Sequence, residues 1–307
     1  MSPGGHSHGP STSAGGMHRG KLLVVLAITS TVLVAELVGS ALTGSLALLA
    51  DAGHMATDVA GILLAVLAVT FASRPATPER TFGYYRLEIL AAMVNAMLLF
   101  GVALYILREA WQRWNSPPEV DGGLMLVFAV VGLIANLIGL ALLRSGAQES
   151  LNVRGAYLEV LGDMLGSVAV IVAAIVIALT GWVRADVVAS VGVALMILPR
   201  TWSLLREAID VLLETTPRGV DLTQVREHIL KTPGVIDAHD LHAWTITSGM
   251  PVLSVHVVVN DEALAEGGSA RILAALGDCL AEHFDVEHCT FQLEPAGHSD
   301  REHTAHA

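Results

Sequence analysis

The sequence predicts a membrane-embedded all-α bundle of six helices followed by a small cytosolic α+β domain. The chain of 307 residues is 53% hydrophobic and only 15% charged, which is a low charged fraction for a soluble protein of this size. Its apolar residues also come in long blocks, as they do in membrane spans. From about Asp221 onward, short stretches that alternate apolar and polar residues replace these blocks, which is typical of a soluble domain with strands.

Each of the six predicted spans is at least as long as the roughly 20 residues that are needed to cross a bilayer. Most arginines and lysines flank one set of span ends, so the positive-inside rule puts both termini in the cytoplasm. Trp111, Trp114 and Trp182 fall at the opposite ends, where aromatic rings prefer the membrane interface. The spans are Leu22–Leu42, Ser45–Ala72, Leu87–Trp111, Leu124–Leu143, Ala156–Thr180 and Val183–Trp202.

The two ends of the chain are expected to be disordered, over residues 1–20 and 296–307. The first tail is rich in glycine, serine and proline, and its histidines would hold a metal only transiently. It contains no apolar signal region, so we expect the first span to be retained. The histidines of the first tail are His6, His8 and His18.

The soluble domain is expected to cover residues 214–295, after a membrane domain of residues 21–213. Its pattern predicts the order α-β-β-α-β of a ferredoxin-like domain, with Ser248 and Gly249 in a hairpin turn. The elements are Asp221–Thr232, Val235–Thr247, Val252–Asn260, Gly268–His283 and Glu287–Leu293.

The charge of the chain is a net −12, and most of the excess acids lie in the soluble domain. This balance argues against nucleic acid as a partner and fits a domain that handles cations. The two cysteines, Cys279 and Cys289, lack CxxC spacing and are expected to be reduced thiols. No phosphate-binding glycine-rich loop and no nucleophile–base arrangement is present, so we do not expect an enzyme.

Ionisable residues recur at helical spacing inside two of the spans. Asp51, His54 and Asp58 share one face of the second span, and Glu159 and Asp163 share one face of the fifth. Each acid near the bilayer centre costs roughly 2.5–3.5 kcal/mol, so four together cost on the order of 10 kcal/mol. No lysine or arginine lies at matching depth to neutralise them.

These residues are suited to hold a divalent cation. Imidazole nitrogens and carboxylate oxygens are zinc ligands, and two pairs on facing helices complete a tetrahedron. Because the same atoms bind protons, and imidazole titrates near neutral pH, protons and metal would compete for the site. The alternative is a buried polar network that only fixes helix packing. Glu36, Asn95 and Asn136 are expected to form such helix–helix hydrogen bonds.

Four sequence motifs are similar to those of the cation diffusion facilitator family, and most to the bacterial cobalt–zinc–cadmium resistance exporters. They are His54–Asp58, Thr81–Glu88, Asn152–Asp163 and His239–Trp244, and the resemblance extends from about residue 20 to 295. It implies a homodimer that moves metal by alternating access, driven by inward proton flow, and the composition suggests a bacterial inner membrane. The implied transport ligands are His54, Asp58, Glu159 and Asp163.

The resemblance also implies a metal site in the soluble domain and a charge pair at the membrane surface. The matching ligands are His239, His256 and Glu294, with His242 as a fourth. The alternative to a metal site is that His256 is an ordinary, partly buried strand histidine and that Glu294 is a solvated acid at the end of a strand. The implied charge pair is Arg86 with Glu214.

Two positions differ from the pattern of relatives. Zinc-selective relatives often have histidine where this chain has Glu159, and a harder oxygen ligand there should loosen the preference for zinc over cobalt or cadmium. Residues 73–81 contain no histidine or aspartate, so we do not expect the additional loop site of some relatives.

The leading hypothesis is a proton-coupled antiporter that exports zinc, and also cobalt and cadmium, from the cytoplasm. A second is a membrane-anchored metal sensor without transport, and a third is a transporter of another cation or small solute.

Overall fold

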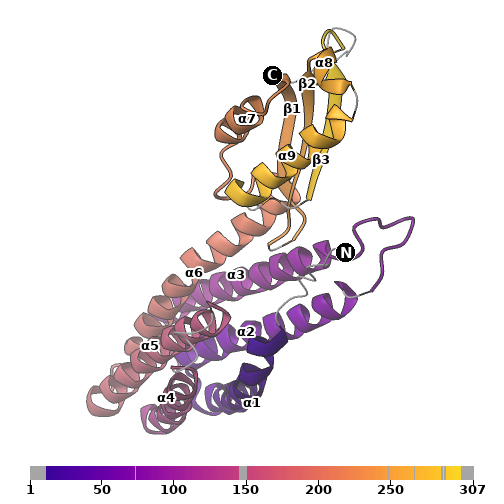
Figure 1. The fold of residues 1–307 in the computed structure, drawn as a ribbon. Coiled ribbons are helices and arrows are strands. Elements are labelled where there is room, and N and C mark those ends of the chain that lie inside the picture. The colour runs from indigo at the N-terminus through magenta and orange to yellow at the C-terminus, as the bar shows by residue number, and fades with distance from the viewer. Residues whose placement is uncertain are drawn as a thin grey trace. The chain divides into compact units, whose positions relative to one another are not determined.

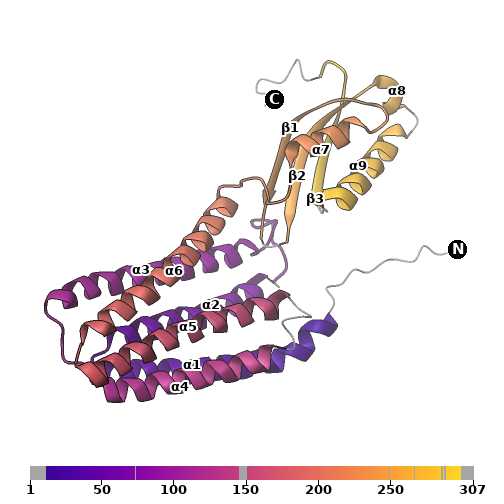
Figure 2. The same ribbon diagram turned by 90° about the vertical axis from the view of Figure 1, so that its left-hand side faces the viewer.

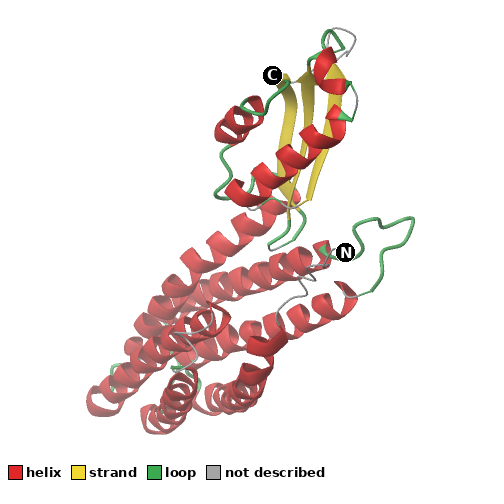
Figure 3. Ribbon diagram, in the orientation of Figure 1, coloured by secondary structure: helices red, strands yellow, loops and turns green. Residues whose placement is uncertain are grey.

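The computed structural model describes residues 12–72, 74–144, 151–247, 249–265, 267–284, 286 and 288–298. The chain divides into two compact units (Figure 1). The first contains Met1–Leu64 and Val94–Leu204, and the second contains Ala65–Met93 and Leu205–Ala307. Strands occur only in the second unit among the described residues (Figure 3).

Long helices make up the first unit and extend into the second. Within the first unit α4 packs along both α1 and α5 (Figure 2). The helices are α1 (Thr12–Thr43), α2 (Leu46–Ala72), α3 (Arg86–Asn115), α4 (Gly122–Leu143), α5 (Leu151–Thr180) and α6 (Arg184–Leu212).

Five of these helices contain described stretches that are long and apolar enough to cross a membrane. α2 has 27 residues and carries Asp51, His54 and Asp58. Large apolar side chains such as Leu98, Ile134 and Val172 face outward and are exposed. Contiguous apolar surface of this kind suits lipid rather than water. The five stretches are Leu26–Thr43, Arg86–Asn115, Gly122–Leu143, Val160–Thr180 and Arg184–Leu212.

The helices of the first unit are held together by two buried apolar clusters. In one, Leu46 of α2 packs with Leu99 of α3 and Ile197 of α6. In the other, Leu48 of α2 packs among the side chains of α4 and α5, including Met125. Both clusters include several alanines, and small residues of this kind are common where membrane helices pack together.

Several helices are longer than the apolar runs that predicted them. α1 begins at Thr12, so the predicted disordered tail overlaps this helix, and residues 1–11 lie outside the described residues. α6 continues past Trp202 to Leu212 although Pro199 lies inside it. A run of apolar residues marks the part of a helix that lipid covers, and the helix itself can continue into more polar sequence.

The soluble part of the second unit contains a three-stranded sheet with the order β1-β2-β3. β1 pairs antiparallel with β2, and β2 pairs parallel with β3. α7 and α9 pack against this sheet and against each other. The predicted element order is observed with one addition, the short helix α8. The elements are α7 (Leu222–Leu230), β1 (Val235–Thr245), β2 (Pro251–Val259), α8 (Asp261–Leu264), α9 (Gly268–Phe284) and β3 (His288–Pro295).

This domain has its own apolar core. Ile272, Leu276 and Leu280 recur every four residues along α9 and pack on alternate residues of β2, including Val255 and Val257. The β1–β2 turn includes Gly249 at φ +73°, and Ser248 lies outside the described residues. β3 begins at His288 and runs to Pro295, so Glu294 lies within the strand and not beyond its end as the predicted boundary implied.

Candidate metal sites

The first candidate site lies between α2 and α5. His54 Nε2 is 3.2 Å from Asp163 Oδ1 on α5 and 3.7 Å from Asp58 Oδ2 one turn along α2. One ligand atom from each of the three residues lies within 4.8 Å of the others. His54 and Asp163 are buried, and Asp58 is partly buried. Two helices therefore bring three of the four predicted transport ligands together.

The fourth predicted ligand, Glu159, lies on α5 one turn before Asp163. Residues four apart share a helix face, so the backbone puts Glu159 on the side of α5 that carries Asp163. The Glu159 side chain lies outside the described residues. Its part in the site stays a prediction.

The donor set of this site suits a divalent cation with nitrogen and oxygen ligands. His54 Nδ1 is buried and has no hydrogen-bond partner among the described residues. An imidazole with two carboxylates offers zinc its usual non-sulfur ligands, with room for one more. A cavity of about 220 Å³ adjoins His54 and is also lined by Asp51, Gly162 and Arg200. This volume is sufficient for several water molecules around an ion.

A second group of buried polar side chains lies beside the ligands. Ser167 Oγ of α5 donates to Asp51 Oδ2 at 3.3 Å, and Asn136 Nδ2 of α4 donates to Ser167 Oγ at 3.3 Å. The expected helix–helix hydrogen bond of Asn136 is thus observed. Glu36 of α1 is fully buried, and neither of its carboxylate oxygens has a hydrogen-bond donor among the described residues.

The start of α2 is fixed by Asp186, a residue of α6 that sequence reasoning missed. Its carboxylate accepts hydrogen bonds from Leu46 N at 2.7 Å, Ala47 N at 3.1 Å and Ser45 Oγ at 2.6 Å. The first amides of a helix have no partner within the helix, and a carboxylate there also opposes the positive end of the helix dipole. Asp186 therefore anchors the helix that carries His54 and Asp58.

The second candidate site lies on the sheet of the soluble domain. His239 of β1 and His256 of β2 are cross-strand partners, and their ring centroids are 5.2 Å apart. Glu294 of β3 is buried, with Oε1 at 2.8 Å from His256 Nδ1 and Oε2 at 3.6 Å from His239 Nε2. Three predicted ligands from three strands therefore meet at one place.

A bulge in β1 puts Asp240, and not the predicted His242, beside His239 and His256. The register shifts between His239 and His242, and Asp240 there adopts φ +47°. Ligand atoms of His239, Asp240 and His256 lie within 4.8 Å of one another, whereas His242 is exposed opposite Ser254 and does not belong to this group. Sequence alternation cannot reveal a bulge, so Asp240 was missed.

The thiols do not contribute to either group of ligands. Cys289 Sγ donates to the carbonyl oxygen of Val286 at 3.3 Å, and burial raises the pKa of the Cys289 thiol. Since the thiolate is the metal-binding form, a raised pKa makes Cys289 a poor ligand.

Two polar contacts join the start of α3 to the rest of the second unit. Arg86 Nη2 donates to Glu214 Oε1 at 2.5 Å, which is the expected charge pair. Thr247 Oγ1, next to the β1–β2 turn, donates to Glu88 Oε2 at 2.5 Å. The first pair is partly exposed and contributes little to stability by itself, about 0–1 kcal/mol.

Comparison with known proteins decides the family. Residues 22–213 match the model of the cation efflux transmembrane domain, and residues 217–296 match that of the cation efflux protein cytoplasmic domain. The chain belongs to the cation diffusion facilitator family. The resemblance read from the four sequence motifs is thereby confirmed. As a member of this family with five helices of membrane length among the residues that the structure describes, the chain is an integral membrane protein.

Three members of the cation diffusion facilitator family illustrate the similarity. The metal cation efflux system protein CzcD of Cupriavidus metallidurans is 52% identical over 292 residues, which cover 95% of this chain and 90% of that protein. The cadmium, cobalt and zinc/H(+)-K(+) antiporter of Bacillus velezensis is 41% identical, with 96% and 93% covered. The zinc transporter ZitB of Escherichia coli is 41% identical, with 94% and 91% covered.

Proposed function

We propose that this protein exports zinc, and also cobalt and cadmium, from the cytoplasm in exchange for protons. The observation that carries the proposal is the convergence of His54, Asp58 and Asp163 at one buried place between two helices of a membrane domain. The names of the relatives support it, since they include metal efflux, zinc transport and cadmium, cobalt and zinc antiport.

Competition between metal and protons at the same atoms couples the two flows. The substrate cation enters from the cytoplasm and binds His54, Asp58, Glu159 and Asp163, which must be deprotonated to bind it. When α2 and α5 rearrange and the site opens to the other side, protons take the ligand atoms and the metal leaves. The protonated site then returns to the cytoplasmic side. A cluster of charged carboxylates with neither metal nor protons bound would be costly in the membrane. The site is therefore disfavoured from returning to the cytoplasmic side while it is empty.

The architecture that goes with this function has six crossing helices, α2 included, and both termini in the cytoplasm. A membrane domain of residues 21–213 is followed by a ferredoxin-like cytosolic domain of residues 214–295. Two copies form a homodimer in a bacterial inner membrane. The match of residues 217–296 to a cytoplasmic domain supports the placement of this part. The protein acts as a transporter and not as an enzyme.

The cytosolic site has a regulatory role in this proposal. Metal held by His239, His256 and Glu294, with Asp240 as a further ligand in place of the predicted His242, draws the two domains of the dimer together and favours the inward-facing state. The buried position of Glu294 beside both histidines supports a metal site there, since a buried carboxylate needs a charged partner.

Flux in proteoliposomes tests the proposal. With an imposed pH gradient, the wild-type protein should move zinc, and Asp58→Ala and Asp163→Ala should each abolish the flux. Asp278→Ala, which removes an exposed acid of the cytosolic domain, is the matched control and should leave it unchanged. Undiminished flux in both membrane variants would refute the proposal.

The alternative function is a metal sensor, and the cytosolic ligand group is the observation that favours it. A sensor would bind zinc at His239 and His256 and show no zinc flux in wild-type proteoliposomes. The same assay therefore separates the two functions.

A further inference from the structure

The segment between α2 and α3 carries two arginines, Arg74 and Arg80, that stack on aromatic rings. The Arg74 guanidinium lies over the Phe71 ring at 4.4 Å, and the Arg80 guanidinium lies over the Tyr84 ring at 4.5 Å. In the part of the chain that the structure describes, neither arginine pairs with a carboxylate, whereas Arg86 pairs with Glu214. Stacking on an aromatic ring holds a guanidinium group in place and leaves its edge N–H groups available.

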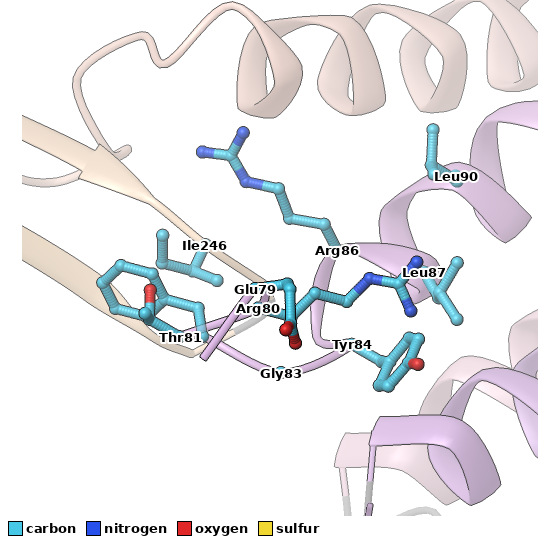
Figure 4. A pocket seen from close by; sticks show the side chains of 10 residues that line it. Glu79, Arg80, Thr81, Gly83, Tyr84, Arg86, Leu87, Leu90 and Ile246 are labelled. Carbon is cyan, nitrogen blue, oxygen red and sulfur yellow. The ribbon is translucent and has the colours of Figure 1, made fainter. Parts of the chain in front are cut away.

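Each of the two arginines lines a hollow. One hollow of about 400 Å³ is lined by the two arginines Arg80 and Arg86, by one acid, Glu79, and by side chains that include Tyr84, Leu87 and Leu90. Figure 4 shows the Arg80 guanidinium between Leu87 and Tyr84, while Arg86 extends away in another direction. The other hollow, of about 600 Å³, includes Arg74, and residues 81–83 line both hollows. The Phe71 and Tyr84 rings on which the two arginines stack have centroids 6.2 Å apart, so the two arginines lie near each other.

The segment is preformed within its unit. The Phe82 ring meets the His288 ring of β3 edge-on with centroids 5.7 Å apart, and backbone hydrogen bonds join Thr77 and Arg80 in both directions. The Arg86–Glu214 and Glu88–Thr247 contacts fix the residues that follow. A ligand would therefore find the arginines in position, without the entropic penalty of ordering a loop.

The position of the segment along the chain puts it at the membrane surface. It leads directly into α3, which has membrane length from its first residue, Arg86. Leu90 and Val94, one and two turns into α3, are exposed as lipid-facing residues are. The Arg80 hollow thus combines two arginines and one acid with the apolar side chains of Leu87 and Leu90, at the depth where phospholipid headgroups lie.

We propose that this segment is a binding site for a phosphate group carried by an anionic phospholipid. Arg80 and Arg74 donate N–H groups to the phosphodiester oxygens, the Tyr84 hydroxyl lies in the headgroup layer, and Leu87 and Leu90 contact the start of an acyl chain. Guanidinium groups bind phosphate with paired N–H donors, which favours arginine in this role. The site contains none of the proposed metal ligands, so lipid binding does not depend on the cation that is exported.

Native mass spectrometry of the full chain in detergent micelles tests the site. The wild-type protein should retain phosphatidylglycerol in preference to zwitterionic phosphatidylcholine. Arg74→Gln with Arg80→Gln should weaken phosphatidylglycerol retention about 30-fold, since each arginine near a charged surface contributes about 1 kcal/mol and every 1.4 kcal/mol is tenfold. Arg206→Gln, an exposed arginine of α6, is the matched control and should keep wild-type retention.

Two outcomes would overturn the proposal. Equal retention of phosphatidylglycerol by the wild type and the double variant would show that the arginines do not bind it. The second outcome concerns inorganic phosphate. If it binds the wild type only when both arginines are present, and if it displaces phosphatidylglycerol, the ligand is a soluble anion and not a lipid. Failure of zinc transport would leave the retention measurement unaffected, so the two proposals can fail separately.

Discussion

His54 is the residue at which the two sides of the proposed exchange meet. Its Nε2 atom faces Asp163 at 3.2 Å and Asp58 at 3.7 Å, so a proton on that nitrogen and a metal ion occupy the same position. Its Nδ1 atom has no hydrogen-bond partner among the described residues. Metal-binding histidines are usually held in place through their other nitrogen. Here only Nε2 faces carboxylates, so a proton on Nε2 would be held by Asp163 and would have to leave before a metal ion could bind there.

Glu159 is the residue that should broaden the range of exported cations. Replacement by histidine, Glu159→His, adds a second imidazole to the site, and imidazole suits zinc better than a harder carboxylate oxygen does. We expect the ratio of zinc to cobalt flux to rise about tenfold, which corresponds to about 1.4 kcal/mol. Flux of zinc, cobalt and cadmium in competition measures the ratio.

Glu159→Gln is the control for this substitution. It keeps the size of the side chain and removes its charge, so it should slow zinc and cobalt alike. A ratio that stays at the wild-type value in Glu159→His would show that Glu159 does not contact the cation.

At the scale of elements, α5 comes close to the Asp51 side chain of α2 at Gly166. A Cβ atom at Gly166 of α5 would lie 2.9 Å from Asp51 Oδ1, whereas a Cβ atom at Gly162, one turn earlier, would meet nothing within 4 Å. Glycine at position 166 therefore lets α5 pack against the carboxylate-bearing face of α2.

This pair of glycines supplies a matched test of helix packing. Gly166→Ala should lower the free energy of unfolding by about 1–3 kcal/mol, the usual effect of overpacking a buried contact, and should reduce zinc flux. Gly162→Ala should keep the free energy of unfolding within about 1 kcal/mol of wild type or raise it, since alanine favours helix. Thermal unfolding in detergent measures both. Equal effects of the two substitutions would contradict the packing assigned to Gly166.

Some contacts between elements could be predicted from the sequence, and others could not. The spacing of His54, Asp58 and Asp163 predicted their convergence, because helical periodicity puts residues four apart on one face. The anchoring of α2 by Asp186 could not be predicted, since 140 residues separate Asp186 from Leu46 and no local pattern connects them. Asp240 was missed for a related reason, because a bulge breaks the alternation from which strand faces are inferred.

At the scale of the whole molecule, each of the two units has its own apolar core and its own candidate metal ligands. A chain with the membrane ligands removed should therefore still bind zinc through the soluble domain. This separation makes the two sites accessible to independent measurement.

Zinc titration of the full-length chain tests the cytosolic site. In the Asp163→Ala background, one class of zinc site should remain per chain. Addition of Glu294→Gln should weaken zinc binding at this site by more than about 100-fold, because Glu294 is proposed as a direct ligand. Loss of a residue that only orients a ligand typically weakens metal binding about 10–100-fold. Addition of His298→Ala, which removes an exposed histidine of the same domain, should not weaken zinc binding. Loss of zinc binding in Asp163→Ala alone would contradict two separate sites.

Above all, we propose that the membrane domain holds one ion by an imidazole and carboxylates. Zinc X-ray absorption on the His256→Ala, Glu294→Gln chain, loaded with one zinc per chain, tests it most directly. We predict about four nitrogen and oxygen ligands at about 2.0–2.2 Å, including an imidazole, and loss of this signal when Asp163→Ala is added. A sulfur ligand at about 2.3 Å, or an unchanged spectrum after Asp163→Ala, would contradict the account.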